Sequence, residues 1–170
     1  MDSIIASTYR PIEIVMVDDG SQDNSLNIAQ DYCTYHPDCV VIAQANQGVS
    51  AARNKAIQSA QGTYILPVDA DDKIGDTFIQ QAVEVMEKND NIRVVGCRCW
   101  MFGVVNKEWE LPKFSHALLA RKNMIPATAL YRKADWERCG GYCEEEIYRE
   151  DWDFWLSIME LGGTFYKLDE

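Results

Sequence analysis

The sequence predicts an α/β domain with a mostly parallel sheet, for three reasons. Short apolar runs rich in β-branched residues alternate with stretches of helical period. The chain has 170 residues and 47% hydrophobic content, enough to form one core of ordinary size. No repeat, low-complexity tract or linker divides it. We therefore expect a single domain over residues 1–170.

The strands are predicted where apolar runs are bounded by polar or glycine-containing segments, as is typical of strands buried on both faces. They cover residues 12–17, 40–43, 63–68 and 92–97. Helical patterns lie between them at residues 25–35, 49–60 and 77–88. Asp76 is the predicted N-cap of the last of these helices.

After residue 97 the pattern becomes less regular. The predicted elements are a hairpin or extended excursion, a short helix, a strand, a helical turn, a helix and a closing strand. They cover, in this order, residues 100–111, 115–122, 127–131, 133–138, 150–161 and 164–168.

The charge of the chain limits its partners. The net charge is −11, from 16 basic and 27 acidic residues. Nucleic-acid binding depends mainly on cationic side chains that displace counterions, so DNA and RNA are excluded as partners. The same charge argues against direct electrostatic attachment to an anionic membrane, although a lipid-linked acceptor remains open.

We expect a cytoplasmic location, with the inner face of the membrane as an alternative. No apolar stretch approaches the roughly 20 residues that cross a bilayer, and the sequence does not begin with a basic secretory leader. The cysteines are sparse for a disulfide framework and form no C-x-x-C pair. We expect free thiols at Cys33, Cys39, Cys97, Cys99, Cys139 and Cys143.

Two acidic clusters follow predicted strands. Residues 18–23 follow the first strand, and residues 69–72 follow the third. Ligands bind at the carboxyl ends of the strands in open α/β sheets, so these carboxylates are expected in one crevice. A divalent cation would relieve their repulsion and could bridge to a diphosphate. The alternative is that they are ordinary turn and cap residues, with Asp23 capping the next helix.

Known acidic and phosphate-binding motifs do not account for these clusters. Lys73 and Ile74 stand where a calcium-binding EF-hand loop starting at Asp69 needs an oxygen ligand and a glycine. The sequence also lacks G-x-G-x-x-G and a Gly-Lys step, which argues against Rossmann dinucleotide sites and P-loops.

A third polar segment, residues 46–54, leads into a helix. Arg53 would lie in the early turns of this helix, where it could contact phosphate oxygens. The alternative is a solvent-facing arginine behind an ordinary glycine turn.

Together, these segments resemble the family 2 glycosyltransferases of the GT-A fold. The resemblance rests on residues 12–21, 46–54, 67–72, 125–130, 140–142 and 150–152. Each motif is short, but their order and spacing are specific. The resemblance implies a Rossmann-like sandwich with a mostly parallel central sheet and helices on both faces. It also implies transfer of a sugar from a nucleoside-diphosphate-sugar to a saccharide or lipid-linked acceptor, with inversion.

The resemblance also implies roles for individual residues. Asp71 matches the second acid of the family's D-x-D motif, a ligand of Mn²⁺ or Mg²⁺, and Asp72 would support it. Asp151 matches the general base of the family's E-D motif, with Glu150 beside it as the second catalytic residue. The residues implied to bind the donor are Asp18, Asp19, Gly20, Ser21, Asn46, Gly48, Arg53, Asp69 and Ala70.

The acids at the start of the last predicted helix have an alternative explanation. The helix dipole favours Glu150 and Asp151 in a first turn even without a chemical role. Aromatic residues nearby could stack on an acceptor sugar, or they could belong to the core or its rim. These are Tyr148, Trp152 and Trp155, and core packing is favoured for the two tryptophans.

Compared with the family pattern, the chain lacks an opening strand and a C-terminal segment with a metal-binding histidine. We therefore expect a fragment with an unpaired strand edge, a homodimer formed through that edge, and weak activity. The rival interpretation is a noncatalytic nucleotide-binding or assembly module of the same fold. A sugar nucleotidyltransferase is disfavoured because its glycine-rich phosphate loop is not visible.

Overall fold

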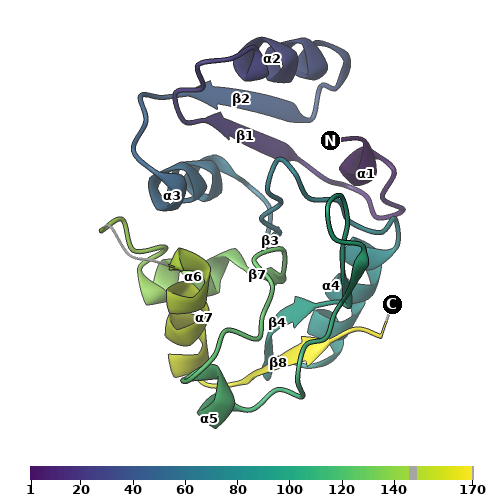
Figure 1. Cartoon of the computed structure of the whole chain (residues 1–170), viewed down its shortest axis with the longest axis vertical. Helices are drawn as coiled ribbons and strands as arrows, with labels where there is room; N and C mark the ends of the chain where they lie inside the picture. Colours follow the sequence, from purple (N-terminus) through teal and green to yellow (C-terminus); the bar gives the residue numbers. More distant parts are fainter. Residues whose placement is uncertain (146–148, 170) are drawn as a thin grey trace.

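The computed structural model of the chain describes residues 1–145 and 149–169 and contains the predicted succession of strands and helices (Figure 1). The strands are β1 (Ile14–Asp18), β2 (Cys39–Ala43), β3 (Tyr64–Ile65), β4 (Ile92–Gly96), β5 (Cys99–Met101), β6 (Lys107–Trp109), β7 (Leu130–Arg132) and β8 (Thr164–Lys167). The helices are α1 (Asp2–Ile5), α2 (Ser25–Tyr35), α3 (Val49–Ser59), α4 (Phe78–Lys88), α5 (His116–Leu119), α6 (Lys133–Cys139) and α7 (Glu150–Glu160). In the described part of the chain, no helix is long and apolar enough to cross a membrane.

The main sheet is mixed, with strand order β3-β7-β4-β8. Strands β4 and β8 are parallel, whereas β7 runs antiparallel to both β3 and β4. Strands β1 and β2 form a separate parallel pair, and β5 and β6 form a hairpin in the region predicted for one. Among the described residues, β1 pairs only with β2, so its other edge has no strand partner.

The β3 strand is shorter than predicted. Its ladder covers only Tyr64–Ile65 instead of residues 63–68. Pro67 has no backbone N–H to donate to a neighbouring strand, which explains why the pairing ends before it.

Helices cover both faces of the main sheet, as expected. Successive residues of a strand point to opposite faces. Val94 of β4 packs in a cluster with Phe154 and Trp155 of α7, whereas its neighbour Val95 packs in a second cluster with Met86 of α4. Figure 1 shows α4 and α7 on opposite sides of β4.

The predicted helix cap at Asp76 is wrong. Helix α4 begins at Phe78 behind Thr77, and no side-chain cap hydrogen bond is formed. The Asp76 carbonyl instead accepts hydrogen bonds from the backbone N–H and hydroxyl of Thr8, at 2.8 and 3.2 Å. This segment is therefore held by the N-terminal region of the chain and not by a local cap.

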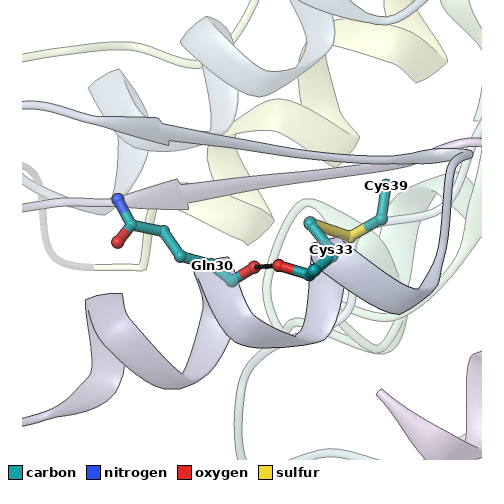
Figure 2. Close-up of a disulfide and its surroundings, with 4 residues drawn as sticks. Gln30, Cys33 and Cys39 are labelled. Atoms are coloured by element: carbon teal, nitrogen blue, oxygen red, sulfur yellow. Dashed lines mark hydrogen bonds between the residues drawn. A yellow bond between two sulfur atoms is a disulfide. The ribbon is translucent and has the colours of Figure 1, made fainter.

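Two of the six predicted free thiols are paired. Cys33, in the last turn of α2, forms a disulfide with Cys39 at the start of β2 (Figure 2). The connection between helix and strand spans only residues 36–38. This tight return brings the two Cα atoms to 5.0 Å, inside the range that a disulfide spans. The other four cysteines are free, as expected.

We expect reduction of this disulfide to lower the free energy of unfolding. The cysteines are 6 residues apart in sequence, and closing so short a loop stabilises the folded state by roughly 2 kcal/mol. Urea unfolding of the wild type and of a Cys33→Ser, Cys39→Ser double variant measures the difference. In denatured protein without added reductant, four cysteine thiols should react with a thiol reagent. Reaction of all six would contradict the pairing and is the result expected for a protein from a reducing cytosol.

Candidate active site

The acidic loop after β1 is tied to the segment that precedes α3. Asp19 accepts hydrogen bonds from the Gln44 side chain at 2.8 Å and from the backbone N–H groups of Gln47 and Gly48 at 2.9 and 2.8 Å. These bonds, first of all the one from Gln44, lower the pKa of Asp19 below its ordinary value. The Asp19 carboxylate therefore organises the loop that leads into α3.

Gly20 allows the two segments to approach closely. Its φ is +80°, and a Cβ at this position would lie 3.0 Å from the backbone nitrogen of Asn46. Only glycine fits this combination of left-handed backbone and close contact. The neighbouring Asp18 carboxylate accepts a hydrogen bond from the Ser21 N–H at 3.3 Å. Asp18, Asp19, Gly20, Asn46 and Gly48 thus belong to one contiguous part of the structure.

Arg53 is the centre of a second group of residues. It lies on α3 with its side chain only 11% exposed, and its Nη2 is 2.8 Å from Asp69 Oδ1. Its Nη1 is 2.7 Å from Glu150 Oε1. Burial alone would lower the pKa of Arg53, but the Asp69 hydrogen bond and the surrounding negative charge raise it above its ordinary value. One guanidinium therefore joins the acidic loop after β3 to the start of α7.

Helix α3 connects the two groups. Gly48, which binds Asp19, is its N-cap, and Arg53 is the fifth helical residue. At 1.5 Å rise per residue, Arg53 lies only about 8 Å along the helix from Gly48. Two of the residues predicted to bind a donor, Gly48 and Arg53, thus lie within the first turns of a single helix, and each contacts one of the two acidic loops.

The loop containing Asp69 and Asp71 is a tight turn. The Asp72 N–H donates to the Asp69 carbonyl at 3.0 Å, and the Asp72 carboxylate accepts from the Thr128 hydroxyl at 3.0 Å. Ala70 and Asp71 are exposed at its tip. No hydrogen bond or ion pair joins the Asp71 carboxylate to another described side chain.

The protein side chains of this loop would supply only some of the ligands that a metal ion needs. Over residues 1–145 and 149–169, no group of three metal-ligating side chains is present. Asp69 is already paired with Arg53, which leaves Asp71 as the free carboxylate. Mg²⁺ commonly binds through one or two carboxylates, substrate phosphates and waters, so a single exposed aspartate is compatible with a metal that a diphosphate completes.

The acids of α7 have different partners although they are adjacent in sequence. Glu150 pairs with Arg53, whereas Asp151 accepts a hydrogen bond from the Asn123 side chain at 2.8 Å. Both lie in the first helical turn, where the dipole favours acids. Arg149, just before them, has a φ of +78°, a left-handed conformation that is uncommon outside glycine.

Arg53 is supported by the segment that follows α6. The guanidinium lies 5.5 Å from the ring centroid of the buried Tyr142. The neighbouring Asn54 donates to the Tyr142 carbonyl at 2.8 Å and accepts from its N–H at 2.9 Å. Gly141 has a φ of +82°, and a Cβ there would lie 2.9 Å from Asn54 Oδ1. The glycine is therefore needed for this contact.

The aromatic residues near the acids are divided between core and rim. Trp155 is fully buried in the core, as favoured. Trp152 is partly buried and donates its indole N–H to the Leu119 carbonyl at 2.7 Å. Tyr148 lies outside the described residues.

Two residues of the site were not predicted. Asn123 binds Asp151, and Gln44 binds Asp19. Gln44 directly follows a predicted strand, so its position at a strand end was a usable signal. Asn123 lies in a region of irregular pattern, and the sequence offers no signal for it. A hollow of about 160 Å³ lined by residues of α1 and the start of β2 contains none of the predicted site residues.

Comparison with known proteins agrees with the fold and the motifs. The model of the family described as glycosyl transferase family 2 matches residues 1–153. The glycosyltransferase EpsJ of Bacillus subtilis is 33% identical, with all of this chain aligned to 54% of EpsJ. YibD of Escherichia coli is also 33% identical, over 82% of this chain and 38% of its own length. The chain thus spans about half, or less, of these relatives.

Solved structures share the fold at lower identity. TarS of S. aureus, solved as residues 1–349 in complex with UDP, has a TM-score of 0.83 and 21% identity, over 99% of this chain and 52% of that one. The mannosyltransferase PcManGT of Pyrobaculum calidifontis, in complex with GDP-Man and Mn²⁺, has a TM-score of 0.76 and 19% identity. The match covers 99% of this chain and 49% of the PcManGT chain. Both are similar in architecture to this chain.

Proposed function

The chain belongs to glycosyl transferase family 2, and on that premise we propose that it transfers a sugar from a nucleoside-diphosphate-sugar to an acceptor hydroxyl. The observation that carries the proposal is the placement of Arg53. Its single guanidinium binds both Asp69 of the acidic loop and Glu150 of the E-D pair. Glu150 is 97 residues away from Arg53 in the sequence. Donor-binding and acceptor-activating groups would thereby share one site.

The donor would lie along the start of α3. We assign the nucleoside to the loop of Asp18 and Asp19, and the diphosphate to the region of Arg53 and the Asp69–Asp71 turn. Asp69 neutralises part of the Arg53 charge before the donor arrives, so a diphosphate would compete for that guanidinium. The complexes of TarS with UDP and of PcManGT with GDP-Man support this class of donor without selecting the base.

Asp71 would hold Mn²⁺ or Mg²⁺ together with the diphosphate. When bound, such an ion stabilises the negative charge that develops on the leaving diphosphate. The contribution of the chain is to keep Asp71 free at the tip of a turn, while Asp69 is occupied by Arg53. The Mn²⁺ reported for PcManGT supports this proposal.

Asp151 would act as the general base. Its carboxylate would take the proton from the acceptor hydroxyl as that oxygen attacks the anomeric carbon, and the diphosphate would leave from the opposite face. A single displacement of this kind inverts the configuration. Asn123 would orient the carboxylate through its hydrogen bond. Glu150, occupied by Arg53, is better assigned to positioning than to proton transfer.

A donor screen tests this function and separates it from a noncatalytic binding module. The chain would be incubated with UDP- and GDP-sugars, Mn²⁺ and a panel of saccharide and lipid-linked acceptors. Acceptor-dependent release of nucleoside diphosphate is the expected result. Nucleotide binding without any turnover across the panel would instead support the noncatalytic module.

We also propose a homodimer formed through the free edge of β1. The unpaired N–H and C=O groups of such an edge favour pairing with a second copy. Light scattering over a range of protein concentrations should give the mass of two chains. A non-reducing denaturing gel should show single chains, which excludes crosslinking through the free cysteines. A monomer at every concentration would contradict the proposal.

A further inference from the structure

The hairpin of β5 and β6 exposes an unusual number of large apolar side chains. Trp100 and Phe102 are 60% and 52% exposed, and Val104 at the tip is fully exposed. Met101, Val105 and Trp109 are exposed as well. Turn tips are normally built from polar residues and glycine, whereas this one has the sequence Phe-Gly-Val-Val. The exposed apolar tip therefore indicates a surface that binds another molecule or a membrane.

The exposed apolar side chains lie on both faces of the hairpin. Met101 pairs with Lys107 and Cys99 with Trp109, which puts Met101 and Trp109 on one face. Trp100, opposite Glu108, lies on the other face. A protein partner would normally cover one face of such a hairpin. An apolar tip with aromatic residues on both faces is better suited to insertion into a lipid bilayer, which contacts all sides of an inserted segment.

The charge of this region differs from that of the whole chain. Residues 97–123 carry five basic and two acidic side chains, although the chain as a whole carries −11. Within the hairpin, Arg98 at the base is paired with Glu108 at 2.7 Å, whereas Lys107 lies two residues after the apolar tip. Tryptophan and lysine are both residue types that are typical of segments at the level of lipid headgroups.

The hairpin also lies beside the candidate active site. The Lys73 ammonium, directly after the Asp69–Asp72 turn, is 5.5 Å from the centroid of the Phe102 ring. A surface that received the hairpin would therefore lie next to the proposed metal and diphosphate site.

We propose that the tip of this hairpin, residues 102–105, inserts into the interfacial region of a lipid bilayer. Apolar burial of the two valines and Phe102 would drive the insertion, and Trp100 and Trp109 would lie at headgroup level. Insertion itself does not depend on the proposed function. If that function holds, the hairpin would present a lipid-linked acceptor to Asp151.

Vesicle flotation of the full chain tests the proposal. Vesicles of phosphatidylcholine, and of phosphatidylcholine mixed with phosphatidylglycerol, would be compared for the wild type and a Val104→Asp, Val105→Asp variant. We expect the wild type to float with the vesicles. The affinity of the variant for the vesicles should be lower by a factor of about ten or more. Ile28→Asp, at another exposed apolar side chain on α2, should bind like the wild type. Melting temperatures of all three proteins check that each is folded.

Other results would overturn the proposal. These are absence of wild-type binding to both kinds of vesicle, or equal binding by the tip variant. Conversion of a wild-type oligomer to a monomer by the tip substitutions, with vesicle binding unchanged, would identify the hairpin as a contact between copies. Glycosyl transfer from donor to a soluble acceptor is measured separately, so failure of membrane binding would leave the proposed function untouched.

Discussion

Asp151→Asn is expected to lower kcat about 10²- to 10⁴-fold, the usual contribution of a general base. The amide has nearly the same shape and can still accept the hydrogen bond from Asn123, which is 2.8 Å long in the wild type. It cannot take a proton from an acceptor hydroxyl. Binding of the donor should be unchanged, because Asp151 does not contact the segments assigned to the nucleotide.

The matched control for this variant is Asp153→Asn. Asp153 also lies in the first turn of α7, but it is exposed. Both substitutions remove one negative charge from the same helix terminus, so they weaken the dipole interaction to a similar extent. Unchanged kcat in Asp151→Asn, or an equal loss in both variants, would remove Asp151 as the base.

Arg53→Met is expected to abolish donor binding and to destabilise the fold. Removing the guanidinium leaves Asp69 and Glu150 without their shared cation. Breaking a fully buried pair costs roughly 3–5 kcal/mol, and we expect about 2 kcal/mol here because the carboxylates remain partly hydrated. Urea unfolding and calorimetric titration with UDP and GDP measure the two effects.

Two further variants separate charge from geometry. Arg53→Lys keeps a positive charge, but a single ammonium cannot reproduce the planar fork that spans both acids, so donor binding should stay weak. Arg98→Met removes an exposed arginine that is paired with Glu108 at 2.7 Å and should change stability by less than about 1 kcal/mol. Normal donor binding in Arg53→Met would contradict the assignment of Arg53.

Local patterns were sufficient to predict most elements of the fold. Alternating apolar and helical periods located the strands and helices because those periods depend on nearby residues. The errors occur where tertiary contacts decide. The Asp76 carbonyl accepts a hydrogen bond from Thr8, 68 residues away, and α4 begins at Phe78 behind Thr77 instead of behind Asp76. The Cys33–Cys39 disulfide depends on how tightly the chain returns from α2 to β2.

The candidate site was predicted through motifs, and the structure adds the contacts between the residues of those motifs. No local pattern reveals that Arg53 lies against Glu150, or that Asn123 binds Asp151, because these pairs are 97 and 28 residues apart. The motif pair Glu150 and Asp151 suggested similar roles for two adjacent acids. Their different partners now favour a positioning role for Glu150 and proton transfer for Asp151.

The most direct test is thermal unfolding with UDP or GDP in the presence and absence of Mn²⁺. At about one hundred times the dissociation constant, the preferred nucleotide with Mn²⁺ should raise Tm by about 5–10 °C. Asp71→Ala should lose the manganese-dependent part of this rise, while Asp31→Ala, at an exposed position on α2, should retain it. Two results would contradict the account. One is an equal rise in Tm when Mn²⁺ is left out and when Asp71 is replaced by alanine, and the other is no rise in Tm of the wild type with either nucleotide.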